Sequence, residues 1–513
     1  MTVADPAELS KIRTLAELAE LVASLRARGL TVVQCHGVFD LLHVGHLRHF
    51  EAAKRAGDVL IVTLTPDRWV NKGPLRPAFD ERMRLEMLAG LSCVDYVALN
   101  EWPTAVETIK LVKPSVFAKG SEFSDRAADI TGAIAAEEAA ILSVGGRLLL
   151  TDDAVFSSSH LINRYLSQLS PPAAEFLDRF RAKYSAADVA GYLERAADLK
   201  VLVIGESIID EYNYCETLGK SGKEPILAMR ELGAERFAGG ALAVANHLAG
   251  FTSHIGLVSM LGEVDSCEEF IRAKLSPSVA ASFLTMQGAP TIIKRRFIEN
   301  YPFQKLFETY RLGEDQAAAA NSARLLSTLA AAIPYYDLVV VADYGHALLD
   351  DAAIDLICRE AKCLALHTQA NAGNFGFHTV SKYSRADFIC VSEKEIRLEA
   401  RQRQKDLHRI VEQTARRLRA SRALITRGQQ GVLCWDDAAG FTTVPALASH
   451  FHDRHSAGDA VLAVSSLCVP QQAPAETMGL ICNAVGAMAV ETIGNRTPIE
   501  RTPLLRFLGS LFK

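Results

Sequence analysis

The sequence lacks the features that would place this protein in a membrane, a disulfide-rich scaffold or a nucleic-acid complex. No apolar run approaches the roughly 18 residues of a transmembrane helix, and the start of the chain lacks the charged-then-apolar layout of a signal peptide. The 10 cysteines are spread singly without a C-x-x-C pair, which argues against disulfides and zinc knuckles. The net charge of −5, with scattered basic residues, argues against nucleic acid or an anionic membrane as the main partner. We therefore expect a cytoplasmic protein that binds small molecules.

The chain is too long for one ordinary core, and its composition is that of a globular protein. Its 513 residues suggest about two to four domains. Between residues 30 and 120, strand-type apolar runs alternate with helical stretches, which predicts a parallel α/β sheet. These runs are "DVLIVTLT" (58–65), "VDYVAL" (94–99) and "SVFAKG" (115–120). A later run, "VLVIGES" (201–207), opens a second α/β series.

Helical segments flank the first α/β series. Thr14 and Glu17 form a capping-box pattern at the start of a helix that ends near Gly29. The predicted divisions are an N-terminal helical extension (1–29), a first α/β domain (30–165), a helical linker (166–197) and a second α/β domain (198–513). Within the last, residues 291–299 alternate like a half-exposed antiparallel strand, which indicates a small lid sheet.

Two histidines flank a glycine in "CHGVFDLLHVGH" (35–46), at a predicted strand-to-helix turn. A metal site needs three or four ligands, and only Asp40 is close to His43 and His46. Core packing would explain one histidine more easily than two. Because a helix N-terminus binds anions, the pattern favours a phosphate-binding turn.

The same stretch resembles the G-x-F-D-x-x-H-x-G-H signature of the cytidylyltransferase-like nucleotidyltransferases. Further matches follow in the family's order: "RWVNKGPLRPAFDERMRLEML" (68–88), "KPSVFAKGSEF" (113–123) and "FSSSHLI" (156–162). The resemblance implies a Rossmann-like domain in which a phosphate oxygen attacks the α-phosphorus of a nucleoside triphosphate and releases pyrophosphate. Such a reaction depends on alignment and on neutralising charge at phosphorus. It implies His43, His46 and Lys72 as catalytic residues, and as nucleotide-binding residues Gly37, Phe39, Asp40, Gly45, Lys119, Ser157, Ser158 and Ser159.

Two distant stretches mark the second domain, "FAGGALAVANHLAG" (237–250) and "HDRHSAGDAVLA" (452–463). Taken alone, "SAGDA" fits any capped helix start. Together the two stretches resemble the signatures of the ribokinase-like (PfkB) sugar kinases, as do "VIGESIIDEY" (203–212), "VADYGHALL" (341–349) and "TRGQQGV" (426–432). The resemblance implies a ribokinase-like α/β domain with a small lid sheet.

The resemblance also implies roles for single residues. Asp459 is the expected catalytic base, and the N–H groups of Ser456, Ala457 and Gly458 are expected to stabilise the transferred phosphoryl group. The remaining assignments are substrate binding by Asp210, Gly239, Gly240, Asn246, Lys294 and Arg296, nucleotide binding by Thr426, Gly428 and Gly431, and water-mediated Mg²⁺ binding by Glu395. For Lys294 and Arg296, an exposed charge pair on the lid is the alternative interpretation.

The second domain departs from the family pattern at three positions. Ser456 replaces a glycine, Ser392 replaces the asparagine three residues before Glu395, and His346 replaces the lysine after D-Y-G. The leading hypothesis is a bifunctional, homodimeric enzyme that requires Mg²⁺. It phosphorylates a heptose-like sugar phosphate with ATP and then transfers a nucleotidyl group from ATP or CTP to the sugar 1-phosphate. This pairing resembles bifunctional heptose-phosphate enzymes with the domain order reversed. The alternative keeps the nucleotidyltransferase and makes the second domain a non-catalytic sugar-binding or dimerisation module. An alditol or aminoalcohol phosphate is a further candidate substrate.

Overall fold

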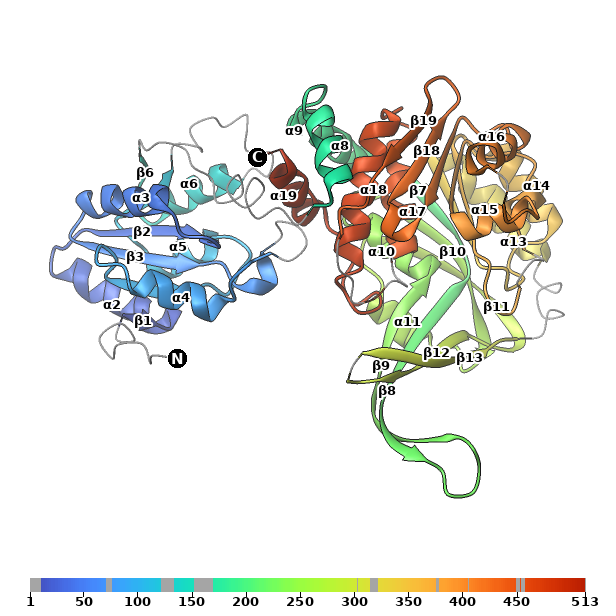
Figure 1. Ribbon diagram of the computed structural model, residues 1–513, viewed down its shortest axis with the longest axis horizontal. Helices are drawn as coiled ribbons and strands as arrows, with labels where there is room; N and C mark the ends of the chain where they lie inside the picture. Colours follow the sequence, from blue (N-terminus) through green and yellow to red (C-terminus); the bar gives the residue numbers. More distant parts are fainter. Residues whose placement is uncertain are drawn as a thin grey trace. The chain divides into compact units, whose positions relative to one another are not determined.

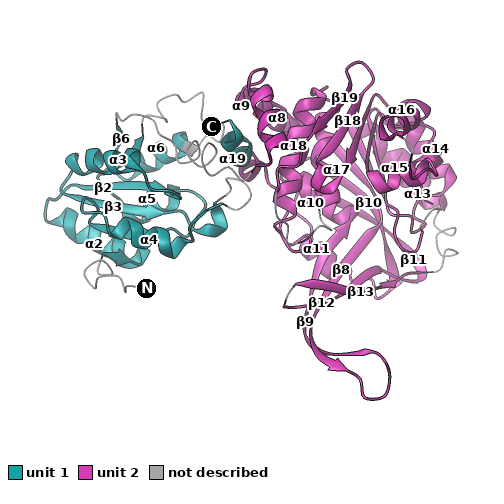
Figure 2. Cartoon of the chain, viewed as in Figure 1, with its two compact units in different colours: residues 1–168, 505–513 teal, residues 169–504 magenta. Residues whose placement is uncertain are grey.

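The computed structural model describes residues 11–70, 76–120, 133–151, 169–301, 303–313, 322–374, 378–404, 406–448, 453 and 457–512. Predictions for Lys72, Ser157, Ser158, Ser159 and Ser456 lie outside these residues. The chain forms two compact units, Met1–Gln168 with Leu505–Lys513, and Leu169–Leu504 (Figure 2). In the described ranges, none of the helices combines the length and apolar character needed to cross a bilayer.

The first unit is a parallel six-stranded sheet with helices against it (Figure 1). The strands run in the order β1-β4-β3-β2-β5-β6, and the described pairs are all parallel. Its elements are β1 (Ile12–Arg13), α2 (Leu15–Ala27), β2 (Val32–Gly37), α3 (Val44–Arg55), β3 (Val59–Leu64), α4 (Glu81–Ala89), β4 (Tyr96–Leu99), α5 (Val106–Val112), β5 (Val116–Gly120), α6 (Ala133–Ser143) and β6 (Arg147–Thr151). The predicted α/β fold is confirmed, while β1 and β6 were not predicted.

The position of β2 in this sheet defines where a ligand would bind. The chain continues from β2 to β3 on one side, whereas β5 pairs with β2 on the other side. In open parallel sheets, ligands bind at the carboxyl ends of strands where the order reverses in this way. The turn with His43 follows β2 directly, so the fold places the histidine pair at this switch point.

The second unit is built on a nine-stranded sheet in the order β11-β10-β7-β14-β15-β16-β17-β18-β19, parallel except for β18 and β19. Its strands are β7 (Val201–Gly205), β10 (Ile255–Val264), β11 (Val279–Pro290), β14 (Leu338–Asp343), β15 (Leu364–Thr368), β16 (Phe388–Ser392), β17 (Arg422–Thr426), β18 (Val432–Asp436) and β19 (Gly440–Val444). Its helices include α10 (Ala241–Ala249), α11 (Glu268–Lys274), α13 (Ser322–Ala332), α14 (Asp351–Glu360), α15 (Glu393–Glu399), α16 (Leu407–Arg417), α17 (Ala457–Cys468) and α18 (Ala475–Ala489), and α19 (Arg501–Leu511) follows them. The buried β7 and β14 form the centre of the core.

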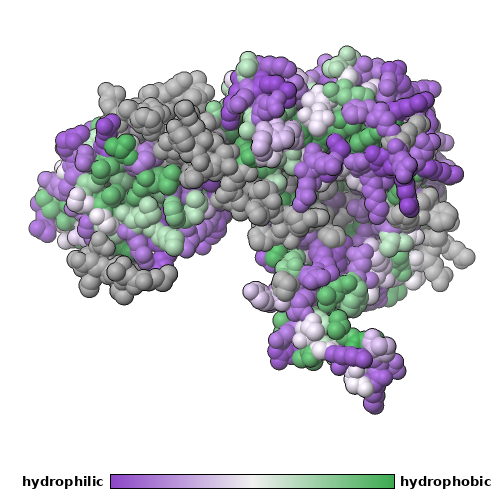
Figure 3. Space-filling view, viewed as in Figure 1, coloured by the Kyte–Doolittle hydropathy of each residue, from purple (hydrophilic) through white to green (hydrophobic). Residues whose placement is uncertain are grey.

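A separate four-stranded sheet forms the predicted lid, in the order β13-β12-β8-β9. Its strands are β8 (Ser207–Lys220), β9 (Leu227–Gly240), β12 (Ile292–Glu299) and β13 (Gln304–Arg311). Strand β12 is antiparallel to β13 and parallel to β8, so the antiparallel prediction holds for one neighbour only. Beyond Cys215, β8 and β9 continue as a two-stranded arm (Figure 1). The arm exposes Leu218, Ile226 and Leu227 among polar residues, as the mixed surface in Figure 3 shows.

The helices before β7 pack against the second unit. These are α8 (Pro171–Arg181) and α9 (Ala186–Arg195), within the stretch predicted as a linker. Lys183 Nζ lies 3.0 Å from Glu476 Oε1, and Gln471 Nε2 donates to Tyr192 O at 2.8 Å. The helical character agrees with the prediction, but the contacts make both helices part of the kinase-like unit.

Candidate active sites

In the first unit, His43 and His46 cap the start of α3. His43 Nδ1 accepts a hydrogen bond from Gly45 N at 3.0 Å, and His46 Nδ1 accepts one from His43 N at 3.4 Å. The two ring centroids lie 4.0 Å apart. Because each Nδ1 is an acceptor, the proton of each neutral ring is on Nε2. The pair therefore lies at a helix N-terminus, a place that suits phosphate oxygens.

Gly37 and Phe39 support His46 through packing. Phe39 adopts a left-handed backbone conformation with φ of 48°, which is rare for a bulky residue. A Cβ on Gly37 would lie 2.9 Å from Phe39 Cζ, so only glycine leaves room for this ring. The ring meets His46 and Phe50 edge-on at centroid distances of 5.4 and 5.1 Å. These contacts assign both residues a positioning role, where the sequence predicted nucleotide contact.

The Asp40 carboxylate binds the segment from Arg76 to Phe79. The carboxylate is 1% exposed, accepts from Ala78 N at 2.6 Å and Phe79 N at 3.3 Å, and pairs with Arg76 at 3.1 Å. A carboxylate that already holds three donors is committed to structure. These contacts tie the Asp40 turn to the segment from Arg76 to Phe79, and the predicted nucleotide contact of Asp40 stays a prediction.

We expect Asp40→Asn to loosen this segment, because the amide loses the ion pair with Arg76 and one acceptor. Amide exchange in the peptide from residue 76 to 84 should accelerate by about 10-fold or more, which corresponds to losing roughly 1.4 kcal/mol of local stability. Hydrogen-exchange mass spectrometry of the full chain measures this rate. Glu51→Gln, an exposed change on α3, is the matched control. Unchanged exchange in Asp40→Asn would contradict the assigned role.

Two further basic residues lie at the same sheet edge. Lys119 ends β5 beside β2, and its ammonium lies 2.8 Å from Glu137 Oε2. Arg84 is fully buried and donates to Phe79 O at 2.9 Å and Thr65 O at 3.1 Å. The predicted nucleotide contact of Lys119 stays a prediction, and the role of Arg84 as an anchor of the loops was not predicted. In the sequence, the burial of Arg84 is indicated only by its place on the same helix face as Leu88.

In the second unit, Asp459 lies in the first turn of α17, after Ala457 and Gly458. It is 7% exposed, and its Oδ1 accepts a hydrogen bond from the Tyr344 hydroxyl at 2.8 Å. Burial raises the pKa of Asp459 to about 6, against the opposing effect of the Tyr344 hydrogen bond. The carboxylate is therefore mostly charged at neutral pH and close to the range of an efficient general base.

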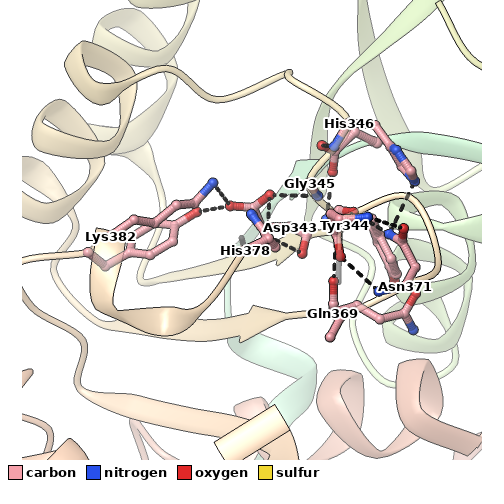
Figure 4. Close-up of polar contacts among 12 residues, drawn as sticks. Asp343, Tyr344, Gly345, His346, Gln369, Asn371, His378 and Lys382 are labelled. Carbon is pink, nitrogen blue, oxygen red and sulfur yellow. Dashed lines mark hydrogen bonds and ion pairs between the residues drawn. The ribbon is translucent and has the colours of Figure 1, made fainter. Parts of the chain in front are cut away.

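Tyr344 itself is held from both sides (Figure 4). Its backbone N–H donates to Glu206 Oε2 at 2.9 Å, and His346 N donates to the other Glu206 oxygen at 2.9 Å. Its carbonyl accepts from Asn371 Nδ2 at 2.7 Å and from Asn374 Nδ2 at 2.8 Å. Three strand ends, those of β7, β14 and β15, thus converge on one turn.

Asp343 anchors this turn from the opposite direction. It accepts from the Tyr383 hydroxyl at 2.6 Å and pairs with Lys382 at 2.6 Å and His378 at 3.1 Å. Burial opposes its ionisation, but the His378 hydrogen bond and the Lys382 charge hold its pKa well below the usual range. Gly345 has φ of 71°, and a Cβ there would lie 2.4 Å from an amide nitrogen of the neighbouring loop. Neither His378 nor Lys382 was predicted, because their segment carries no motif.

His346 occupies the position at which the related kinases have lysine. Burial, together with the Lys294 charge, lowers the pKa of His346 to about 4. Its Nε2 lies 3.5 Å from Asn371 Nδ2. The imidazole is neutral at pH 7, so it supplies no positive charge to a substrate there.

Lys294 and Arg296 project to one face of β12, as the alternation predicted, but both are buried. Arg296 pairs with Asp210 and, at 3.3 Å, with Glu308. Lys294 is 4% exposed and has no hydrogen bond or ion pair within the described part of the chain. Its ammonium lies 5.5 Å from the ring centroids of both Tyr310 and Tyr344, and burial lowers its pKa. The alternative of an exposed charge pair is therefore wrong.

The glycines before α10 and Asn246 have different roles. A Cβ on Gly239 would lie 2.2 Å from Asp210 Oδ2, so glycine permits this close approach, and Gly240 then caps α10. Asn246 donates to Lys274 O at 2.9 Å and accepts from Ser276 N at 2.9 Å. Both ends of its amide hold the turn after α11, and the prediction that Asn246 binds sugar stays a prediction.

On the predicted nucleotide side, Thr426 ends β17, and Gly428 and Gly431 lie in the turn to β18. Glu395 Oε2 accepts from Ser392 N and Ser392 Oγ, both at 2.7 Å, in a capping box for α15. Its Oε1 accepts from a backbone amide at 3.2 Å. Glu395 therefore caps α15, and its predicted water-mediated metal role stays a prediction. No group of three His, Cys, Asp or Glu side chains suited to a metal occurs among the residues that the structure describes.

Asp453 connects the lid sheet to the segment before α17. It accepts from Tyr212 Oη on β8 at 2.5 Å and from Lys305 Nζ on β13 at 2.5 Å. Gly494 N donates to it at 3.0 Å. The carboxylate is 2% exposed, so these contacts form a buried tether between two strands of the lid and the catalytic side of the unit.

A buried carboxylate at a helix start, on a nine-stranded α/β core with a separate four-stranded sheet, is the arrangement of ribokinase-like phosphotransferases. Residues 198–502 match the family model described as pfkB family carbohydrate kinase, and residues 35–164 match the cytidylyltransferase-like model. The first match covers more than half of the chain, and the protein belongs to the pfkB family of carbohydrate kinases. The chain joins this domain to a cytidylyltransferase-like domain.

Curated relatives share only part of the chain. It is 44% identical over 117 residues to bifunctional protein HldE of Trichlorobacter lovleyi, and 39% identical over 145 residues to that of Syntrophotalea carbinolica. These alignments cover 22% and 28% of this chain, and the chain spans about a quarter of the relatives' length (24% and 28%). A phosphofructokinase-2 mutant from Escherichia coli shares the fold, with a TM-score of 0.50 and 13% identity over 61% of this chain and 100% of that one.

Proposed function

We propose that the protein is a bifunctional enzyme of sugar activation. The second unit phosphorylates a heptose-like sugar phosphate with ATP, and the first unit transfers a nucleotidyl group from ATP or CTP to the sugar 1-phosphate, releasing pyrophosphate. The occurrence of both domain families in one chain, and relatives named bifunctional, support this proposal. The retained Asp459–Tyr344 pair argues against a non-catalytic second unit.

The observation that carries the proposal is the buried ammonium of Lys294. Burying an unpaired cation is costly, and an incoming anion offsets that cost. The Asp210 and Asp459 carboxylates favour the charged form of Lys294 from the same region. Neither carboxylate forms a direct ion pair with Lys294 among the described residues, so a sugar that already carries a phosphate would give the ammonium a direct partner, which favours a sugar phosphate over a neutral sugar.

In the kinase step, Asp459 accepts the proton of the sugar hydroxyl while that oxygen forms its bond to the γ-phosphorus and the bond to the ADP oxygen breaks. The backbone N–H groups of Ala457 and Gly458, at the start of α17, stabilise the negative charge of the transferred phosphoryl group. The N–H of Ser456 is proposed to do the same. Thr426 and Gly428 contact the nucleotide. Magnesium would neutralise the triphosphate charge and would be held chiefly by the phosphates and water.

In the nucleotidyl transfer, a phosphate oxygen of the sugar phosphate attacks the α-phosphorus and pyrophosphate leaves. His43 and His46 donate from Nε2 to the phosphate oxygens, where negative charge develops. Lys72 and the serines at 157–159 add donors and positive charge. The phosphate nucleophile is already ionised, so this step needs no strong base.

Product mass spectrometry tests the proposed function. The protein is incubated with ATP and CTP together and with either heptose 7-phosphate or heptose 1-phosphate. We expect a heptose bisphosphate from heptose 7-phosphate and a nucleotide-sugar from heptose 1-phosphate. Absence of phosphorylated product across a panel that also includes alditol and aminoalcohol phosphates would overturn the kinase assignment.

Lys294→Met should separate binding of the sugar phosphate from binding of ATP. We expect KM for the sugar phosphate to rise by about 10- to 100-fold, while KM for ATP changes by less than about three-fold, because a lost charge-assisted contact costs roughly 1.5–3 kcal/mol. Steady-state kinetics of the full chain measure both constants. Lys362→Met, at an exposed lysine before β15, is the control. An equal rise in both KM values would place Lys294 at the nucleotide instead.

We also propose that the protein is a cytoplasmic homodimer. All 10 cysteines lie in described segments and are unpaired thiols, which supports a reducing compartment. The exposed leucine and isoleucine side chains of the β8–β9 arm support association with a second copy. Light scattering coupled to gel filtration determines the oligomeric state, and a monomer at micromolar concentration would contradict the proposal.

A further inference from the structure

We infer that Tyr344 is a positioning residue for Asp459: its hydroxyl holds one carboxylate oxygen so that the other faces the substrate hydroxyl. The inference rests on the proposed kinase function of the second unit. Tyr344 is 2% exposed, and its O–H donates to Asp459 Oδ1 at 2.8 Å. With Oδ1 occupied, Oδ2 is the oxygen available to accept a proton.

The backbone around Tyr344 is fixed more firmly than a core tyrosine requires. Glu206 binds the N–H of Tyr344, and two asparagine amides, from Asn371 and Asn374, bind its carbonyl (Figure 4). Asn371 also orders its own loop, because its Oδ1 accepts hydrogen bonds from Gly373 N at 2.9 Å and Asn374 N at 3.2 Å. Three polar contacts, one from the end of β7 and two from the loop after β15, therefore fix the backbone that carries this phenol ring.

The ring also contacts the side chains of Lys294 and His367. The Lys294 ammonium is 5.5 Å from its centroid, and the His367 ring meets it edge-on at 6.1 Å. The groups that act on Asp459 are the Tyr344 hydroxyl, His367 on β15, Asp210 on β8 and Lys294 on β12. Among them, Tyr344 makes the direct hydrogen bond, so it links the lid lysine to the base.

Removing the hydroxyl has a defined chemical consequence. A hydrogen bond to the charged form of a carboxylate favours ionisation, whereas burial favours the protonated form. Without the tyrosine O–H, burial dominates and the Asp459 carboxyl holds its proton to higher pH. The carboxylate also gains rotational freedom, so fewer complexes present Oδ2 to the substrate. Phenylalanine keeps the ring, its packing and the backbone clamp.

The test compares wild type, Tyr344→Phe and Tyr212→Phe from about pH 5 to 9. Tyr212 is the matched control, because it also donates a buried hydrogen bond to an aspartate, Asp453, without touching the base. In Tyr344→Phe we expect the acid limb of kcat/KM to move up by about one pH unit and the plateau of kcat to fall about 10-fold, with KM for ATP nearly unchanged. Tyr212→Phe should leave the midpoint of the acid limb in place.

A second measurement does not require turnover. Infrared titration with ¹³C-labelled aspartate follows the protonated carboxyl band that Asp459→Asn removes. Its midpoint should lie near pH 6 in wild type and about one unit higher in Tyr344→Phe. Equal midpoints would overturn the inference, whatever the kinetics show. A wild-type protein that titrates as expected but consumes no ATP with any sugar phosphate would instead contradict the proposed function.

Discussion

His46→Ala should abolish pyrophosphate release by the first unit while sugar-dependent ATP consumption by the second unit continues unchanged. In the proposed reaction His46 combines two tasks: its Nδ1 accepts from the N-cap amide, and its Nε2–H donates to a phosphate oxygen. Loss of one preorganised donor to the transferring phosphate costs about 10²- to 10³-fold in rate. Alanine also removes the ring that Phe39 and Phe50 support, so neighbouring side chains cannot restore the donor.

The measurement is coupled pyrophosphate release from heptose 1-phosphate with ATP or CTP. Arg48→Ala, an exposed change on the same helix, is the control and should retain the wild-type rate. Equal loss of both activities in His46→Ala would indicate misfolding or coupled sites. Full pyrophosphate release in His46→Ala would show that the histidine pair caps the helix and nothing more.

Asp459→Asn should reduce phosphorylation of the sugar phosphate by about 10³-fold or more, because the amide cannot accept the hydroxyl proton. The substitution removes a buried charge and keeps the shape of the side chain, so the fold should persist. In wild type, kcat/KM should fall as pH drops below the Asp459 pKa of about 6, since protonation removes the base. That acid limb should disappear in the residual activity of Asp459→Asn.

The assay is sugar-dependent ADP formation, with Asp351→Asn on the exposed face of α14 as the control. Nucleotidyl transfer from supplied heptose 1-phosphate should proceed at the wild-type rate in Asp459→Asn. Mixing Asp459→Asn with His46→Ala should restore each activity that one variant lacks. A wild-type rate of ADP formation in Asp459→Asn would refute the assignment of this carboxylate as the base.

Local sequence patterns were sufficient for parts of both candidate sites. The turn with His43 and His46 and the helix start with Asp459 are each defined within about ten residues, so motif and neighbouring structure agree. Strands β2, β3, β4, β5 and β7 were also predicted, because buried parallel strands appear as continuous apolar runs.

The missed parts depend on contacts between distant segments. Asn371 and Asn374 matter only because β15 lies next to β14, which the sequence does not specify. Glu395 matched a metal motif, but Ser392 captures its carboxylate in a helix cap. Asn246 matched a sugar motif by spacing, yet its side chain meets the turn after α11. Residue type alone could not distinguish a ligand from a cap or a loop anchor.

The contact between Glu206 and Tyr344 determines when the second unit can acquire activity during its synthesis. These residues are 138 positions apart, whereas Gln34 and Thr63, which bond across β2 and β3 in the first unit, are 29 apart. A ribosome adding about 5–20 residues per second needs on the order of 10 s to extend the chain from one kinase contact to the other. The first unit can therefore begin to pair its central strands early. Strand β7 of the second unit has one edge unpaired until β14 has been synthesised. Chaperone demand should consequently concentrate on the nascent chain between these two strands.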